Sequence, residues 1–187
     1  MDAHFLGFRK LGIDIKQDGK YFVLEKKRPA DEEITMSEFS VTGTENIILA
    51  SALNQGKTTI NIAAAEPSVQ DLCWFLQSLG VDIDGIGTHT LTIRGASSVS
   101  GCEHHIVPDP IETGTFVCLA GATRSKLIVE RVAPHFLALE IEKYRAVGLK
   151  IDIEYTDEKA SPHYRLANLK VDGKVELKAI KKLHDMP

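Results

Sequence analysis

The stretch LGVDI at residues 79–83 decides the fold, because the chain repeats it at a constant distance on both sides. The two counterparts are LGIDI at residues 11–15 and VGLKI at residues 147–151. Their glycines, Gly12, Gly80 and Gly148, are separated by two equal intervals of 68 residues. A pattern that returns at a fixed interval is typical of a chain built from repeated structural units.

The residues around Gly80 predict the elements of one unit. The segment SVQDLCWFLQSL (68–79) is predicted as a helix, which begins near Pro67 and ends at Gly80, where positive φ costs glycine little. One face of this helix carries its apolar residues: Val69, Leu72, Leu76 and Leu79. VDID (81–84) and HTLTIRG (89–95) then predict a hairpin closed by the turn GIGT.

The preceding residues complete this unit. SEFSV (37–41) is predicted as a strand, TENIILASALN (44–54) as a helix and TTINI (58–62) as a second strand. The unit is therefore β-α-β-α-β-β over residues 37–94.

The same order of elements is predicted a second time, over residues 104–169. Its segments are HHIV (strand), ETGTFVCLAGAT (helix), KLIVER (strand), PHFLALEIEKYRAV (helix) and the hairpin LKIDIEY with HYRLANL. A helix ending at Leu11 and a hairpin over Gly19 precede the first unit, and a strand KVELKAI (174–180) follows the second. The predicted fold class is α/β (α+β), with two complete units and a partial unit at each end.

Composition excludes several classes of protein. The 187 residues carry a formal net charge of −4 and no basic stripe, which argues against a nucleic-acid partner. Apolar runs such as FVCLAGA are too short to cross a membrane, and the first residues lack the apolar core of a signal peptide. Three cysteines without a CxxC motif favour a reducing, cytoplasmic location.

Two predicted helices begin with Thr-Gly-Thr, at residues 42–44 and 113–115. Thr42 followed by Glu45 matches a capping box, which would satisfy the first amides of the helix locally. Alternatively, these amides and the helix dipole bind an anionic ligand, and two such helix starts in successive units would form an electropositive cleft.

No metal or cofactor site is predicted. His104 and His105 in GCEHH are adjacent on a predicted strand, so their side chains point to opposite faces and cannot ligate one ion. Cys118 lies within an apolar helix and is predicted to be a packed thiol rather than a nucleophile.

Longer motifs now identify a family. AAAEPSVQDLCWFLQSLG, GIGTHTLTIRG and PDPIETGTF occur in this order, and together with SVTGTEN they resemble the enolpyruvyltransferase family over nearly the whole chain. The resemblance implies an inside-out α/β barrel of six β-α-β-α-β-β units in two domains. The domain boundary is expected near Gly87, which gives residues 1–87 to the first domain and 88–187 to the second.

The implied activity is carboxyvinyl transfer from phosphoenolpyruvate to a hydroxyl of UDP-N-acetylglucosamine, in peptidoglycan synthesis; the branch of the shikimate pathway is the alternative. Matching the family's nucleotide-sugar contacts implies a substrate site with two edges. The first edge is Asp2, Ala3 and His4, and the second is Glu38, Phe39, Ser40, Val41 and Thr42.

The departures from the family pattern concern catalysis. Most residues that the family uses for catalysis have no counterpart here, so no catalytic residue is assigned. Asn61 and His89 stand where acidic residues are expected, and Pro110 stands where an arginine is expected. The chain is therefore predicted to be a portion of a carboxyvinyltransferase that is inactive alone; the alternative is a non-catalytic module that binds nucleotide-sugars or serves in assembly. The partial units further predict a homo-oligomer or a complementing chain, through residues 1–25 or 174–180.

Overall fold

The computed structural model describes residues 2–26, 31–158 and 160–180, and the chain forms two compact units, Met1–His104 and His105–Pro187. Unit 1 contains α1 (Asp2–Lys10), β1 (Ile13–Asp18), β2 (Tyr21–Lys26), β3 (Glu32–Thr35), α2 (Val41–Ser51), β4 (Lys57–Asn61), α3 (Pro67–Ser78), β5 (Asp82–Asp84) and β6 (Thr90–Arg94). Unit 2 contains α4 (Pro110–Ala122), β7 (Lys126–Val132), the 3₁₀ turn η1 (Pro134–Leu137), α5 (Ala138–Ala146), β8 (Lys150–Tyr155) and β9 (Ala167–Asp172). The compact units divide after His104; the family's own boundary near Gly87 stays a prediction.

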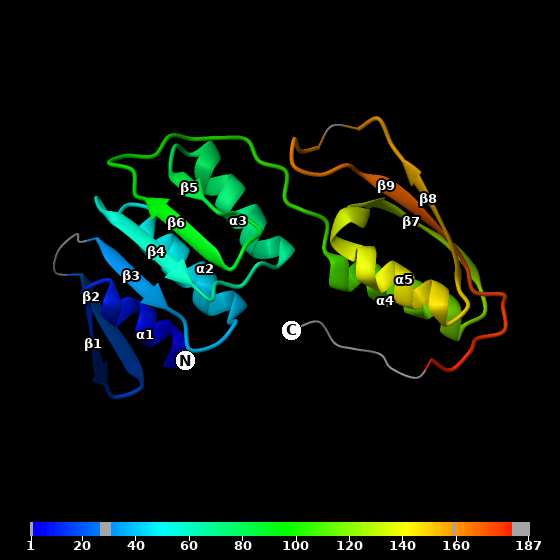
Figure 1. Ribbon diagram of the computed structural model, residues 1–187, viewed down its shortest axis with the longest axis horizontal. Helices are drawn as coiled ribbons and strands as arrows, with labels where there is room; N and C mark the ends of the chain where they lie inside the picture. Colours follow the sequence, from blue (N-terminus) through cyan, green and yellow to red (C-terminus); the bar gives the residue numbers. More distant parts are fainter. Residues whose placement is uncertain (1, 27–30, 159, 181–187) are drawn as a thin grey trace. The chain divides into compact units, whose positions relative to one another are not determined.

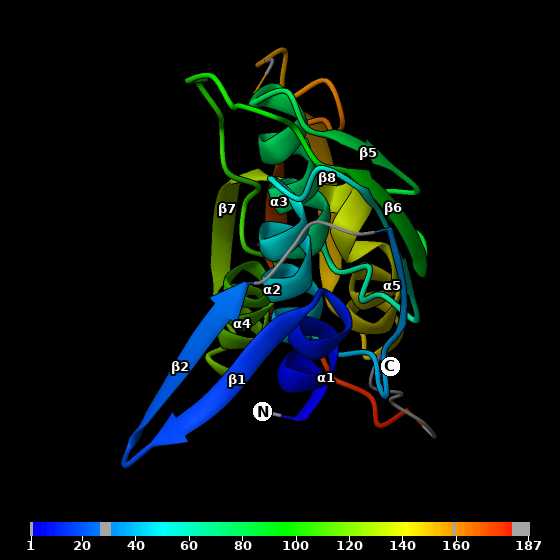
Figure 2. The ribbon, with the colours of Figure 1, turned by 90° about the vertical axis from the view of Figure 1, so that its left-hand side faces the viewer.

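In unit 1 the three helices cover one face of a four-stranded sheet with the strand order β3-β4-β6-β5 (Figures 1 and 2). β3 is parallel to β4, while β6 is antiparallel to both β4 and β5. The inner face of the sheet contributes Ile34, Ile60 and Ile93, all completely buried, and α2 contributes Ile47 and Ile48 to the same core. Alternating side chains of the strands thus meet the apolar faces of the helices.

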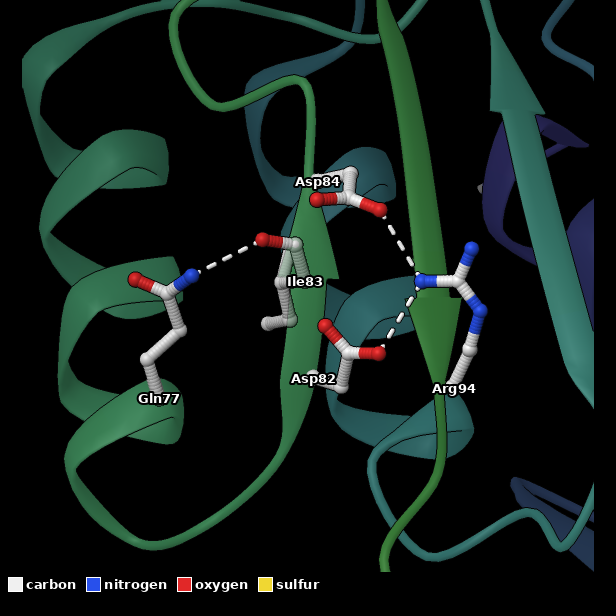
Figure 3. Close-up of polar contacts among 5 residues, drawn as sticks. All are labelled: Gln77, Asp82, Ile83, Asp84 and Arg94. Atoms are coloured by element: carbon white, nitrogen blue, oxygen red, sulfur yellow. Dashed lines mark hydrogen bonds and ion pairs between the residues drawn. The ribbon is translucent and has the colours of Figure 1, made fainter.

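The repeated phrase LGVDI closes a helix and opens a hairpin, as predicted (Figure 3). Gly80 follows α3 with φ +103°, in the region that glycine adopts at least cost. The Gln77 side-chain amide donates to the carbonyl oxygen of Ile83 at 2.8 Å, which ties the helix to β5. Arg94 on β6 forms ion pairs with Asp82 and Asp84 on β5, at 3.0 and 2.9 Å. Because the three charged side chains are exposed, the packing of Ile83 contributes more than these pairs.

The predicted first hairpin forms between β1 and β2, with a two-residue turn at Gly19 and Lys20. Gly12, before β1, has φ +72° and so repeats the conformation of Gly80. Every residue of β2 is exposed, including Phe22 and Leu24, whereas Leu11 is buried in the core of unit 1. The hairpin therefore leaves an apolar surface open on one of its strands.

Unit 2 has a separate three-stranded antiparallel sheet, β7-β9-β8, with α4 and α5 on one face (Figure 1). Gly148 follows α5 with φ +106° and precedes β8, as Gly80 precedes β5. The core is formed by Val117, Ile141, Leu169 and their neighbours. The order α-β-α-β-β of unit 2 matches the last five elements of unit 1, and the two units have separate sheets, as predicted.

Four predicted strands are corrected by the structure. The first strand of the repeat predicted over residues 37–94 is β3, where Ile34 is buried against β4, and residues 37–40 lead into helix α2 instead. Residues 104–107 form no strand, and neither do residues 174–180, because neither segment has a partner strand in the described part of the chain. The last strand lies at Ala167–Asp172, later than the predicted 163–169.

Two helices also begin differently from the predictions. The helix predicted from Thr44 is α2, and it starts at Val41 because Ser40 caps it. The helix predicted from Pro134 begins as the 3₁₀ turn η1 before α5 continues it. On α3 the predicted face is confirmed: Val69 and Leu76 are buried, and Leu72 and Leu79 pack partly buried against the core.

Candidate functional site

The structure brings together the two separate segments that the sequence assigned to a substrate site. His4, in the first turn of α1, lies beside the first turns of α2. Its Nδ1 is 2.9 Å from Nδ2 of Asn46, and its Nε2 is 3.4 Å from Oγ1 of Thr42. Asn46 also donates to the carbonyl oxygen of Thr42 at 2.9 Å. One side chain of α1 thus contacts two residues of α2.

The other residues of the predicted site surround this contact with different exposures. Asp2, Glu38 and Phe39 are exposed, and Ser40 and Val41 are partly buried. Ala3 is only 3% exposed and belongs to the core, so its side chain is not available to a ligand. The ring of Phe39 packs against the His89 ring with centroids 4.6 Å apart.

The start of α2 is capped by Ser40, not by the predicted capping box. The Ser40 hydroxyl accepts from the Gly43 amide at 3.2 Å, and its carbonyl accepts from the Thr44 amide at 2.9 Å. Glu45 instead accepts from the Ser68 hydroxyl at 3.0 Å. Within the described residues, the amides of Val41 and Thr42 have no protein acceptor, as is usual for the first amides of a helix.

The start of α3 lies beside the same turns of α2, through the bond from Ser68 to Glu45. Glu66 precedes α3, and its Oε2 is buried without a hydrogen-bond partner among the residues that the structure describes. A buried carboxylate oxygen of this kind accepts a hydrogen bond from a ligand donor at lower cost than it stays unpaired. Three helix N-termini with partial positive charge, together with a carboxylate acceptor, therefore lie near one another.

Asn46 and Glu66 are the residues that the site prediction missed. Glu66 stands in the quoted motif AAAEP, so the motif itself was a signal for it. Asn46 follows Thr-Gly-Thr-Glu, but its role depends on contact with His4, which is 42 residues away in the sequence. Spacing along the chain does not reveal such a contact.

In unit 2 the helix that carries the second Thr-Gly-Thr segment, α4, has a protein side chain as acceptor for its first backbone amides. The Asp109 carboxylate caps α4 by accepting from the amides of Ile111 and Glu112, at 2.8 and 3.3 Å. A protein carboxylate therefore occupies the position that a bound anion would take at this helix start.

The residues that depart from the family pattern have structural contacts. The Asn61 amide donates to Glu33 at 2.8 Å, and Nδ1 of His89 lies 2.9 Å from the carbonyl oxygen of Ala63. Pro110 occupies the first turn of α4, where proline is well tolerated.

The cysteines and histidines of the described ranges do not form a metal centre. Over the described ranges, no group of three or more His, Cys, Asp or Glu side chains could hold a metal ion. His104 is not on a strand; its Nε2 lies 3.0 Å from the Asp71 carboxylate. Cys118 is exposed, which corrects the predicted packed thiol, and burial raises the pKa of Cys73 to about 12. Among the helices that the structure describes, none is long and apolar enough to cross a membrane.

Sequence comparison gives relatives for most of the chain. The family model described as EPSP synthase (3-phosphoshikimate 1-carboxyvinyltransferase) matches residues 1–186. The UDP-N-acetylglucosamine 1-carboxyvinyltransferase of Hydrogenovibrio crunogenus is 38% identical over 79% of this chain and 35% of its own length. The enzyme of the same name from Coxiella burnetii is 40% identical over 82% of this chain and 36% of its own length. The chain thus spans about a third of the length of these relatives.

Structure comparison agrees on the fold. The enolpyruvyl transferase NikO of Streptomyces tendae has a TM-score of 0.72 at 23% identity and covers 91% of this chain and 42% of its own. EPSP synthase of Acinetobacter baumannii has a TM-score of 0.71 at 20% identity, over 96% of this chain and 41% of its own. With the α/β fold of these transferases and a family match along nearly its whole length, the chain belongs to the EPSP synthase (3-phosphoshikimate 1-carboxyvinyltransferase) family.

Proposed function

We propose that the chain is a portion of a carboxyvinyltransferase that binds UDP-N-acetylglucosamine, in peptidoglycan synthesis in a bacterial cytoplasm, and that it has no turnover by itself. The observation that carries the proposal is the contact of His4 with Thr42 and Asn46, since it joins the two predicted edges of one site. The names of the relatives, which specify UDP-N-acetylglucosamine, support the choice of acceptor.

The chemistry of this site suits an anionic nucleotide-sugar. The open amides of Val41 and Thr42 lie at the positive end of α2 and can donate to a phosphate or a sugar oxygen. Glu66 supplies an acceptor for a sugar hydroxyl or amide, and Phe39 supplies an exposed apolar surface. The described side chains at this site include no lysine or arginine, so backbone donors carry the recognition of charge.

Calorimetry with UDP-N-acetylglucosamine tests the binding. We expect weak binding to the wild type, and a Kd that is about twofold to tenfold higher in His4→Ala, as the loss of one hydrogen bond predicts. Ser40→Gly removes the predicted hydroxyl contact while costing the helix only about a few tenths of a kcal/mol.

The matched control is His105→Ala, an exposed histidine of unit 2 that should bind like the wild type. Absence of heat at millimolar ligand, or equal affinity in all variants, would remove the site assignment. Release of phosphate from phosphoenolpyruvate at an enzymatic rate would instead contradict the proposed inactivity.

A second function is a non-catalytic module that binds a nucleotide-sugar or assembles with another chain. The structural contacts of Asn61 and His89 favour it, because these side chains have taken hydrogen-bonding roles within unit 1. Coding sequence that continues past residue 187 into further repeat units would support the enzyme portion, and an early stop would support the module.

A further inference from the structure

The side-chain amide of Asn46 lies between α1 and α2 and has a hydrogen-bond partner in each helix. Its Nδ2 is 2.9 Å from the carbonyl oxygen of Thr42 and 2.9 Å from Nδ1 of His4. The close packing of the two helices permits this contact, because Gly7, one turn after His4, packs directly on Ile47, where a Cβ would overlap that side chain. The backbone of both helices therefore holds Asn46 beside His4.

The carbonyl oxygen of Thr42 fixes the orientation of the Asn46 amide. A backbone carbonyl only accepts hydrogen bonds, so the Asn46 atom beside it is the amide nitrogen. The flipped amide would place two oxygen atoms 2.9 Å apart with no hydrogen between them. Because the amide nitrogen carries two hydrogens, one is used by Thr42 and the other is directed to His4.

The direction of these bonds decides the tautomer of His4. Since Asn46 donates to Nδ1, that nitrogen carries no proton, and the neutral ring has its proton on Nε2. Nε2 lies 3.4 Å from Oγ1 of Thr42, which then accepts from Nε2–H. The Thr42 side chain is exposed, and over the described ranges its hydroxyl proton has no protein acceptor. This proton is therefore available to a ligand oxygen.

We propose that Asn46 is a positioning residue, which fixes His4 as the Nε2–H tautomer and thereby makes the Thr42 hydroxyl a donor to the ligand. The inference rests on the proposed function, because the ligand is the nucleotide-sugar of that site. The start of α2 then presents donors: this hydroxyl and the open amides of Val41 and Thr42. Such a surface selects ligand oxygens that only accept, as in phosphate and carbonyl groups, since an unpaired donor is costly.

The tautomer of His4 can be measured without ligand. NMR of nitrogen-15-labelled histidine rings distinguishes Nε2–H from Nδ1–H at about pH 8, where an ordinary imidazole is neutral. The His4 signals are those that disappear in His4→Ala. We expect Nε2–H in the wild type. In Asn46→Asp the carboxylate can only accept, so Nδ1 should become protonated.

Binding of UDP-N-acetylglucosamine, followed by the shifts of backbone amide signals, tests the role of the Thr42 hydroxyl. Thr42→Val keeps the shape of the side chain without the donor and should raise the Kd about threefold to tenfold. Thr42→Ser retains the donor and should lose less affinity. Asn46→Asp should weaken binding at least as much as Thr42→Val, because Nε2 of His4 then accepts from the Thr42 hydroxyl and turns its proton away from the ligand.

Gln55→Glu is the matched control for the added charge, because it converts an exposed amide to a carboxylate beyond the far end of α2. It should change neither the His4 tautomer nor the Kd, and circular dichroism checks that all variants are folded. An unchanged tautomer in Asn46→Asp, protonation of Nδ1 with an unchanged Kd, or equal losses in Thr42→Val and Thr42→Ser would each overturn the proposal. A wild type that binds no nucleotide-sugar would remove the proposed function, whereas the two tautomers would still decide whether Asn46 positions His4.

Discussion

At the scale of single residues, Asp172 shows how neighbouring hydrogen-bond donors lower the pKa of a carboxyl group. Its carboxylate forms a 2.9 Å ion pair with Lys126 on the neighbouring strand, and it accepts from the Lys174 amide at 2.9 Å. Lys126 first, and then the Lys174 amide, hold the pKa of Asp172 below its ordinary value. Because Lys126 is exposed and Asp172 is only partly buried, solvent screens this ion pair and its contribution to stability is small.

The sign of the pH effect follows from this lowered pKa. The stabilisation by Asp172 is fully present above the ordinary carboxyl pKa and is lost as the pH falls through the lowered value in the folded state. We therefore expect Asp172→Asn to unfold at a slightly lower temperature than the wild type at neutral pH, with a difference that vanishes in acid. Asp152→Asn, on the exposed face of β8, is the control; a difference that persists at low pH would contradict the assignment.

Single residues of the candidate site differ in how far the sequence reveals them. His4 and Ser40 could be proposed from family motifs, and the structure places both at the first turns of adjacent helices. Asn46 could not, because its contact with His4 depends on the packing of α1 against α2. The spacing of Thr42 and Glu45 predicted a capping box, but the helix begins earlier, because the Ser40 hydroxyl caps it by accepting from the Gly43 amide.

At the scale of elements, a glycine after the last strand of each unit lets that strand approach a helix, α2 in unit 1 and α4 in unit 2. A Cβ at Gly173, after β9, would overlap the carbonyl oxygen of Ala120 in α4. Gly95, after β6, meets the carbonyl oxygen of Asn54, just beyond α2, in the same way. Neither glycine has positive φ, so close approach rather than backbone conformation requires it.

Gly173→Ala should therefore destabilise the protein by about 1–3 kcal/mol, as overpacking against backbone atoms does. Denaturant unfolding followed by circular dichroism measures it. Gly101→Ala is the control, because nothing lies within 4 Å of a Cβ at that glycine. An unfolding free energy of Gly173→Ala equal to that of the control would show that β9 can move away from α4 without cost.

Elements were predicted correctly where several local sequence signals agreed. They were missed where the formation of a strand depended on pairing with a distant segment. The helix α3 has a proline start, an apolar face and a glycine end, and it forms as predicted. Residues 104–107 were predicted as a strand, but a short segment does not supply its own partner strand, and His104 instead contacts Asp71 on α3. The acidic stretch before Ile34 was not predicted as a strand, yet it pairs in parallel with β4, a long-range contact that the sequence does not show.

At the scale of the whole molecule, the chain has two separate hydrophobic cores. One consists of residues of Met1–His104 only, including Ile34, Ile60 and Ile93. The other consists of residues of His105–Pro187 only, including Ile141 and Leu169. The glycines at 68-residue intervals predicted a chain of repeated modules. Each core forms because the sheet and the helices of one unit bury their apolar faces against each other.

Separate cores predict that a cavity in one unit weakens that unit first. Ile60→Ala, at a completely buried position of β4, should cost unit 1 about 2–5 kcal/mol. Native-state hydrogen exchange should then show faster exchange at the amides of β4 and β6 and unchanged exchange in β7 and β9, because local unfolding follows contiguous cooperative segments. Leu169→Ala should give the reverse pattern, and Leu53→Ala, 57% exposed, should change neither. If Ile60→Ala accelerated exchange equally in both sheets, the two units would unfold as one cooperative body, and the division of the core into two parts would have no thermodynamic counterpart.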